Sequence, residues 1–305
     1  MSTASKIGVV LVAFGLLAGV WVVNVSRAGT KVEGCPADCA TAGERQAGPL
    51  RVMSLNMLHG FPRFERLARR LDTIAEEIRR QDADIVCLQE VPWTPHLGSG
   101  ARYLAERTGL NYLYLRANGN RHALLFEEGE AILSRYPLHG ATFVELQPQA
   151  GFFEHRVVLR AVSATPWGDM PVFVTHLTHG DPVVNQGQAA TLIAFVESFG
   201  DDLSLVAGDF NAMADSPQIE AIAGRWLDAF AAASPADPGF TCCVDDLSAG
   251  PGEPLEKRID YLFLVHGRAE QVVSSRLAFD RPARDGDRWL RASDHIGLLV
   301  TLALE

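Results

Sequence analysis

A short apolar segment followed at once by two polar residues is the feature that most constrains this 305-residue chain. Residues 203–207, Leu-Ser-Leu-Val-Ala, predict a buried strand, and Gly208-Asp209-Phe210-Asn211 ends it abruptly. Side chains two residues apart on an extended backbone point the same way, so Asp209 and Asn211 can reach one phosphate, metal ion or water. Because Asp and Asn are also common turn residues, this motif alone does not establish a function.

The N-terminal segment differs in composition from the rest of the chain. Residues 7–25 form an apolar run that is interrupted only by Asn24 and preceded by one cation, Lys6. This length suits a membrane span or a secretory signal, and Ser26-Arg27-Ala28 offers a small-x-small cleavage site. We therefore expect residues 1–28 to be a signal peptide or an N-terminal membrane anchor, with the remainder extracytoplasmic, either anchored or secreted.

Residues 29–49 are rich in small and polar residues and have no hydrophobic period, which predicts a linker. Cys35 and Cys39 within it can bridge each other, and the adjacent Cys242 and Cys243 can pair together or elsewhere. Cys87 lies in an apolar run and is predicted to be a core residue. None of these spacings is typical of a zinc site.

The charge of the chain is acidic. Its formal net charge is −10, so a polyanion such as duplex DNA would be repelled at long range unless a local basic face existed. No such face is evident in the sequence, although catalytic carboxylates contribute to the count and bound cations would offset part of it.

From residue 50 onward, the hydrophobic pattern predicts many strands and few helices. Strands are expected at 50–55, 84–89, 111–116, 122–126, 130–134, 141–146, 156–163, 171–176, 203–208, 259–264, 270–279 and 296–303. Helices are expected at 63–80, 102–107, 186–199 and 216–223. This order, without an internal repeat, predicts one α/β domain over residues 50–305: a four-layer sandwich of two packed, mostly antiparallel β-sheets flanked by helices.

Polar residues follow many of these predicted strands. They are Asn56, Glu90, His176, Asp209 with Asn211, and Asp294 with His295, while Asp260 begins another strand. Carboxylates, carboxamides and histidines are the side chains that bind a hard cation and carry out acid–base chemistry on a phosphate.

The motifs around these residues resemble one known family. In order they are Ser54-Leu55-Asn56, Leu88-Gln89-Glu90, Glu130-Ala131-Ile132-Leu133-Ser134-Arg135, Thr175-His176-Leu177, Gly208-Asp209-Phe210-Asn211, Arg258-Ile259-Asp260-Tyr261 and Ser293-Asp294-His295. The series is similar to that of the endonuclease/exonuclease/phosphatase superfamily, which includes deoxyribonuclease-like nucleases, abasic-site endonucleases, inositol-phosphate phosphatases and sphingomyelinases. The resemblance implies a two-sheet sandwich with the active site at one edge of the paired sheets.

The resemblance also implies a metal site. Glu90 would be the principal carboxylate ligand of Mg²⁺, with Mn²⁺ or Ca²⁺ as alternative ions. Asn56 would complete the metal site or hold the phosphate, and Asp294 would place a second carboxylate near the metal.

The remaining motif residues would carry out acid–base and positioning roles. His295 would be the general base or would stabilise the transition state, with Asp260 holding its ring. His176 would donate to a phosphate oxygen, and Glu130 would orient it as in deoxyribonuclease-like members. Asp209 would align the attacking water, and Asn211 would bind the phosphate. His59 and His179 follow these motifs closely enough to be candidate substrate contacts.

These features predict an Mg²⁺-dependent phosphodiesterase in which water attacks phosphorus. The export segment and the acidic charge favour a lipid head group or small phosphodiester over nucleic acid, and Phe240-Thr241-Cys242-Cys243 resembles exported sphingomyelinase-like members. Phe152, Phe153 and Trp167 could form an apolar lip for a membrane surface, or could pack in the core. An exported deoxyribonuclease-like endonuclease is the alternative enzyme, and a catalytically dead, membrane-anchored binding module is a third hypothesis. We expect a monomer, attached to a membrane if the N-terminal segment is retained.

Overall fold

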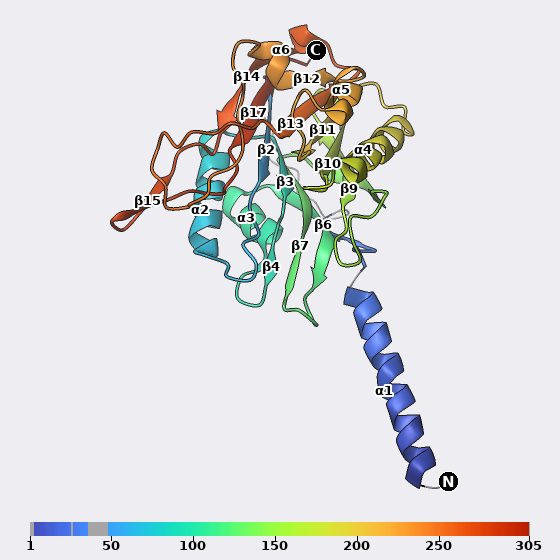
Figure 1. Cartoon of the computed structure of the whole chain (residues 1–305). Coiled ribbons are helices and arrows are strands. Elements are labelled where there is room, and N and C mark those ends of the chain that lie inside the picture. Colours follow the sequence, from blue (N-terminus) through green and yellow to red (C-terminus); the bar gives the residue numbers. More distant parts are fainter. Residues whose placement is uncertain (1–2, 26, 36–47, 305) are drawn as a thin grey trace.

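Two β-sheets packed face to face make up the body of the protein (Figure 1). A computed structural model describes residues 3–25, 27–35 and 48–304. Within this part of the chain, one sheet has nine strands and the other has six. Parallel pairing joins only two pairs of the described strands, β2 with β3 and β10 with β11, and the other pairs are antiparallel.

The larger sheet has the order β1 (Val32–Gly34), β6 (Asn111–Asn120), β7 (Phe126–Ser134), β3 (Ile85–Gln89), β2 (Leu50–Asn56), β17 (Gly297–Leu302) and β14 (Val272–Ala278), with β4 (Trp93–Thr94) and β5 (Gly98–Ser99) beside β7. The smaller sheet has the order β12 (Leu227–Asp228), β13 (Asp260–Val265), β11 (Ser204–Asp209), β10 (Gly168–His176), β9 (Val157–Thr165) and β8 (Leu138–Glu145). A separate hairpin is formed by β15 (Ala283–Asp285) and β16 (Arg288–Leu290).

Four of the helices in the described residues, α2 to α5, cover the outer faces of the sheets. The helices are α1 (Thr3–Val25), α2 (Leu67–Arg80), α3 (Gly100–Thr108), α4 (Pro182–Glu197), α5 (Pro217–Ala223), α6 (Ala229–Ala233) and the 3₁₀ helix η1 (Ala269–Gln271). Apolar side chains of α2 and α3 pack on the larger sheet, and those of α4 and α5 pack on the smaller one. A third apolar cluster, which includes Val52 and Leu205, fills the space between the sheets. The predicted four-layer sandwich is therefore confirmed.

Helix α2 shows how the sequence pattern builds an outer layer. Its buried residues Leu71, Ile74 and Ile78 recur at the spacing of one helical face. The helix begins at Leu67 rather than at residue 63, because Phe64 and Arg66 have left-handed backbone conformations, with φ of 49° and 50°. Residues 63–66, the first turn of the predicted helix, are thus part of a loop.

One charged residue on α2 is buried with the apolar face. Arg70 is 1% exposed, and its guanidinium donates to the backbone carbonyls of Met57, Leu58, Glu65 and Ala292 at 2.9–3.1 Å. Burial lowers the pKa of Arg70 to about 10, which leaves it charged at neutral pH. Arg70 therefore joins the loop after β2 to the segment before β17.

The sequence prediction also differs from the structure within residues 29–49 and 122–126, among other places. Within the expected linker 29–49, residues 32–34 form β1 and pair with Leu113–Leu115 of β6, and Gly29 N–H donates to Arg116 O at 2.8 Å. Residues 122–125, most of the strand expected at 122–126, lie in the turn between β6 and β7, because the Asn120 side chain accepts from the backbone N–H of His122 and Ala123. Cys39 lies outside the described residues.

Helix α1 extends away from the body in Figure 1 and exposes apolar side chains such as Leu11, Phe14 and Leu17. Of the helices in the described residues, none is long and apolar enough to cross a membrane.

We predict that Arg70→Met lowers the free energy of unfolding by about 3–5 kcal/mol, because four carbonyls lose their donors and the nearby acids lose a buried cation. Urea denaturation of the full chain measures the change. Arg69→Met is the matched control. The Arg69 side chain, next to Arg70 in the sequence, is 53% exposed, and we expect its replacement to change the free energy of unfolding by no more than about 0.5 kcal/mol. Equal effects of the two substitutions would contradict the assigned role of Arg70.

Candidate active site

Strand register brings three acid–base side chains of the smaller sheet into one row. His176, at the end of β10, lies beside Asp209, at the end of the parallel strand β11. Asp209 in turn lies opposite Asp260, the first residue of the antiparallel strand β13. In the larger sheet, the parallel pairing of β2 with β3 puts Asn56 beside Gln89, so that Glu90 follows at the same edge.

The carboxylate of Asp209 lies at the centre of this edge. Its Oδ2 accepts from Nδ2 of Asn56 at 3.0 Å, a hydrogen bond that joins the two sheets. The same oxygen is 3.4 Å from Nε2 of His176 and 3.7 Å from Nε2 of His295. Burial next to Asp260 raises the pKa of Asp209 to about 7.

His295 is held by a second carboxylate. Its Nδ1 lies 2.9 Å from Oδ2 of Asp260, and the backbone N–H of Asp260 donates to the hydroxyl of Thr241. Burial opposes charge on the ring, but Asp260 and Asp209 raise the pKa of His295 well above its ordinary value. The geometry fixes the ring with Nδ1–H toward Asp260 and Nε2 toward Asp209.

Glu90 receives donors from both sides. Asn56 Nδ2 donates to Oε1 at 3.1 Å, and the backbone N–H of His59 donates to Oε2 at 3.1 Å. Burial favours the neutral acid, but His59 and the Asn56 hydrogen bond hold the pKa of Glu90 below its ordinary value. The backbone φ of Glu90 is 55°, a left-handed conformation that is costly for a residue of this kind and is typical of functional sites.

Asp294 is the other carboxylate on the Glu90 side of the site. Ser293 donates from Oγ to Asn56 O at 2.6 Å, which fixes the segment before β17 to the end of β2. Burial raises the pKa of Asp294, and the like charge of Glu90 adds to this effect. Two carboxylates that destabilise each other, with oxygen donors only, fit a hard divalent cation.

The expected ligand Asn56 is arranged differently from Glu90 and Asp294. Its Nδ2 faces the carboxylates of Glu90 and Asp209, and its Oδ1 accepts from the backbone N–H of Leu58 at 3.1 Å. In this arrangement Asn56 positions the two acids.

Ligand atoms of Asp209, Asp260 and His295 also lie within 4.8 Å of one another, as in a metal site. However, the 2.9 Å contact between His295 and Asp260 is that of a hydrogen bond which orients an imidazole. The geometry of this group therefore suits acid–base chemistry, while the Glu90 and Asp294 side offers the oxygen donors that a hard cation prefers.

The structure does not place Glu130 where it could orient His176. Nδ1 of His176 lies 2.9 Å from Nη1 of Arg156, and within the described residues Glu130 Oε2 has no hydrogen-bond partner. Burial and the neighbouring Glu128 raise the pKa of Glu130 well above its ordinary value, which favours the neutral acid. Glu130 therefore does not orient His176 as expected from deoxyribonuclease-like members. Arg156 is the residue that contacts Nδ1 of His176.

Asn211 closes the site next to His176. Its backbone N–H donates to Asp209 Oδ1 at 2.8 Å, and its side-chain nitrogen lies 2.9 Å from Nε2 of His176 and 3.0 Å from Leu177 O. His179 Nδ1 lies 3.2 Å from Oδ1 of Asn211, so both histidines expected as candidate substrate contacts, His59 and His179, border the site.

Sequence reasoning missed two cations of this site, Arg70 and Arg156. Arg70 occurs three residues after the buried Leu67 and can reach the same face of α2, but a charged residue on an amphipathic helix is expected on its polar face. Arg156 precedes β9 directly, and nothing in its local pattern distinguishes it from a solvated strand end.

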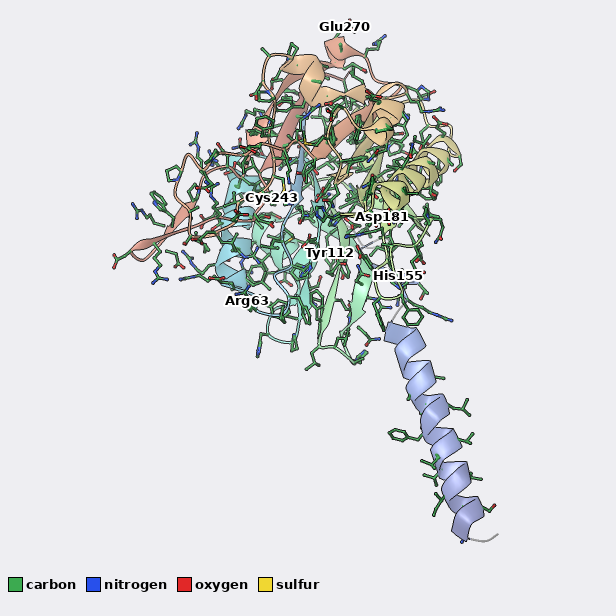
Figure 2. The ribbon with its side chains drawn as sticks, viewed as in Figure 1. Arg63, Tyr112, His155, Asp181, Cys243 and Glu270 are labelled. Carbon is green, nitrogen blue, oxygen red and sulfur yellow. A yellow bond between two sulfur atoms is a disulfide. The ribbon has the colours of Figure 1, made fainter. Side chains whose placement is uncertain are left out.

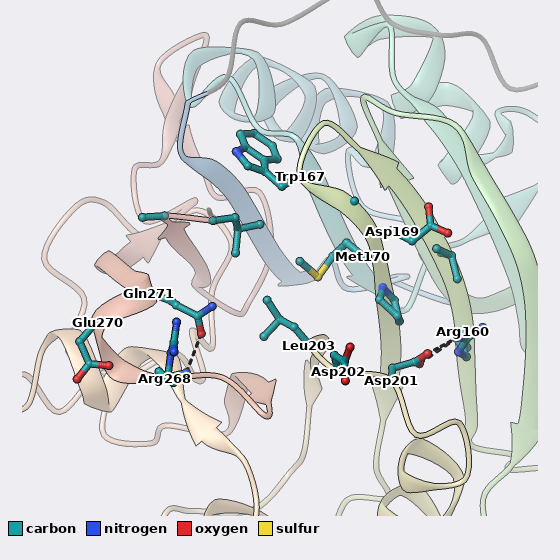
Figure 3. A pocket seen from close by; sticks show the side chains of 15 residues that line it. Arg160, Trp167, Asp169, Met170, Asp201, Asp202, Leu203, Arg268, Glu270 and Gln271 are labelled. Carbon is teal, nitrogen blue, oxygen red and sulfur yellow. Dashed lines mark hydrogen bonds and ion pairs between the residues drawn. The ribbon is translucent and has the colours of Figure 1, made fainter.

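A cavity of about 610 Å³ lies elsewhere, at the opposite edge of the smaller sheet (Figure 3). Trp167, Met170 and Leu203 line it together with Arg268 and Glu270. Figure 2 shows Glu270 at the end of the body remote from Arg63 and His155. Since β10 and β11 begin at this cavity and end at His176 and Asp209, the cavity is separate from the candidate active site.

A family model described as "Endonuclease/Exonuclease/phosphatase family" matches residues 53–295, and the chain belongs to this family of phosphoester hydrolases. No curated protein matches the sequence in a direct comparison.

Several solved structures share the fold of this chain. The chain is 25% identical to an endonuclease/exonuclease/phosphatase from Beutenbergia cavernae, with a TM-score of 0.64 over 84% of this chain and 72% of the other. A family protein from Bacteroides thetaiotaomicron gives 17% identity and a TM-score of 0.68, covering 86% and 100%. A truncated Caenorhabditis elegans TDP2 gives 18% identity and a TM-score of 0.64, covering 83% and 97%.

Asp260→Asn should reduce kcat by roughly 10³ to 10⁴ without unfolding the protein, because the carboxamide no longer enforces the His295 tautomer or balances its charge. Steady-state hydrolysis of a chromogenic phosphodiester, with circular dichroism to check the fold, measures this loss. Asp169→Asn, an exposed carboxylate of β10 remote from the site, is the control and should leave kcat unchanged. Full activity of Asp260→Asn would exclude the proposed orientation of His295.

Proposed function

We propose that the protein is a divalent-metal-dependent phosphodiesterase that acts outside the cytoplasm on a lipid head group or another small phosphodiester. The observation that carries this proposal is the convergence of Glu90, Asp209 and the oriented His295 at one edge of the two sheets. This set provides a cation site, a group to align water and a group to stabilise negative charge, which are the needs of water attack on phosphorus.

The chain's own residues would divide these tasks. Glu90 and Asp294 would hold the cation, and a bound Mg²⁺ would supply Lewis-acid stabilisation of the charge that builds on the phosphate. Asp209, with its pKa near 7, would align the attacking water and take its proton. His295 would donate from Nε2 to a phosphate oxygen, since its raised pKa favours the charged ring. Asn211 would bind a further oxygen.

Exposed apolar side chains around the site support a lipid substrate. We name the following set the apolar rim: Phe61, Leu124, Leu125, Phe152, Phe153 and Met213, which are 41–60% exposed. The rim comprises the loop after β2, the β6–β7 turn, the β8–β9 loop and the loop after β11, all at the edge where His176 and Asp209 lie.

The rim adjoins the expected cation site. The rings of Phe61 and Phe126 stack with centroids 4.5 Å apart, and Phe126 lies 5.1 Å from the ring of His59, which contacts Glu90. A substrate with its phosphate at Glu90 could therefore lay an apolar group on these side chains. Trp167, the third aromatic residue considered for such a lip, instead lines the remote cavity.

The position of the N-terminal segment is consistent with action at a membrane surface. The chain enters the body at Gly29, beside Arg116 of β6, and β6 continues from there to the turn that carries Leu124 and Leu125. Together with the expected export segment, this favours an extracytoplasmic enzyme, anchored or secreted.

To test this proposal, the full chain is incubated with Mg²⁺ and, separately, with each of three substrates. These are choline phospholipid vesicles, plasmid DNA and a chromogenic phosphodiester. Release of the head group without nicking of DNA is the expected result. Nicking alone would instead support the alternative of an exported endonuclease, and binding without hydrolysis of any substrate would support the inactive binding module.

Removal of the cation should abolish turnover. We expect EDTA to reduce the rate to background and added Mg²⁺ to restore it, because Glu90 and Asp294 would repel each other and the phosphate without a cation.

His295→Ala should lower the rate by about 10² to 10⁴ in the presence of Mg²⁺, as is typical for a positioned acid–base group. His139→Ala, at an exposed position on β8, is the matched control and should leave the rate unchanged. Activity that persists in EDTA, or in the His295 variant at full rate, would refute the mechanism.

A further inference from the structure

The contact between Arg156 and His176 is the observation that the functions above do not use. Nη1 of Arg156 lies 2.9 Å from Nδ1 of His176, and Nη2 donates to Glu154 Oε1 at 2.8 Å. The Arg156 side chain is 12% exposed and that of His176 is 4% exposed, so both groups are largely removed from water. Metal and acid–base sites more commonly orient a histidine through a carboxylate or a backbone carbonyl.

A guanidinium restricts the neighbouring imidazole in a way that a carboxylate does not. Arginine carries donors only, so Nδ1 of His176 must accept, and a ring that carries protons on both nitrogens cannot make this contact. The single ring proton then resides on Nε2. A carboxylate in the same position would enforce the opposite tautomer and favour the charged ring.

The surroundings of Nε2 indicate what it donates to. The amide nitrogen of Asn211 lies 2.9 Å away and the Asp209 carboxylate 3.4 Å away. With Nε2 protonated, its N–H faces Asp209 Oδ2 at 3.4 Å, and one hydrogen of the Asn211 amide donates to Leu177 O at 3.0 Å. The second amide hydrogen and the Nε2–H cannot satisfy each other, since both are donors. An anionic oxygen that lies against both would satisfy them, as a phosphate oxygen does.

We propose that Arg156 is a positioning residue that holds His176 as the neutral Nε2–H tautomer, so that His176 and Asn211 together donate to one phosphate oxygen. The catalytic role of His176 in this proposal rests on the proposed phosphodiesterase function. The assignment of its tautomer is independent of that function. His176 binds an oxygen through a neutral donor, while His295, between two carboxylates, carries the positive charge of the site.

The charges around His176 agree with this assignment. Burial and the positive charge of Arg156 lower the pKa of His176 well below its ordinary value, and His295, His59 and His179 act in the same direction. Asp209 is the acid that faces the ring directly. Burial raises the pKa values of Glu128 and Glu130, and the positive charge of Arg156 opposes this rise, so its charge acts on the acids of β7 as well as on the histidine of β10.

The direct test is ¹⁵N NMR of the histidine rings in the full chain, with His176 assigned by the signals lost in His176→Asn. We expect wild-type His176 to show an unprotonated Nδ1 and a protonated Nε2 at neutral pH. Arg156→Gln should give a mixture of tautomers and raise the pKa of His176 toward its ordinary value without reaching it, because burial and the other histidines still oppose the charged ring.

Kinetics provides a second readout of the same variants. Arg156→Gln should lower kcat on the chromogenic phosphodiester by about 10- to 100-fold and add a new ionisation to the pH profile, while Arg156→Lys, another donor, should recover part of the loss. Arg160→Gln is the matched control. Arg160 is a buried arginine of β9 that pairs with Asp201 at the remote edge, and its replacement should leave kcat and the His176 tautomer unchanged.

Two results would overturn the proposal: a wild-type His176 protonated at Nδ1, or an Arg156→Gln variant with an unaltered tautomer. If the wild-type protein hydrolysed no phosphodiester, the proposed function would fail. The ring signals would still decide the role of Arg156.

Discussion

The hydrogen bond between Asn56 and Asp209 is the contact on which the candidate active site depends. It crosses from the last residue of β2 in one sheet to the last residue of β11 in the other. Because the same amide also donates to Glu90, it sets the separation between the expected cation side and the acid–base side. The apolar core between the sheets fixes their spacing, so a few rigid strand ends can hold these groups without flexible loops.

Burial of many acids at one edge would be costly without compensating charge. Compensating positive charge comes from three different segments of the chain, through Arg70, Arg156 and His295. In the described part of the chain, the hydrogen bonds of Arg70 go to carbonyl groups, and its charge acts on Glu90 and Asp294 through space. The charge that still remains unbalanced on the Glu90 side is the physical reason to expect a divalent cation there.

Much of this arrangement could be predicted from the sequence, because strand ends are local features. Apolar runs that stop at Asn56, Glu90, His176 and Asp209 located both the strands and the polar edge. The parts that sequence reasoning missed are set by tertiary contacts. The partner of His176 is Arg156 rather than Glu130, and β1 forms in an expected linker because β6 offers it an edge. Neither contact leaves a periodic pattern in the chain.

Groups from both sheets are proposed to act as one catalytic unit. A double-mutant cycle between Glu90→Gln and His295→Asn, measured as kcat/KM on a chromogenic phosphodiester with Mg²⁺, tests this proposal most directly. For groups that act as a unit, we predict that the double variant loses little more activity than the more impaired single variant. Losses that simply multiply would contradict the claim and would mean that the two sides of the edge work independently.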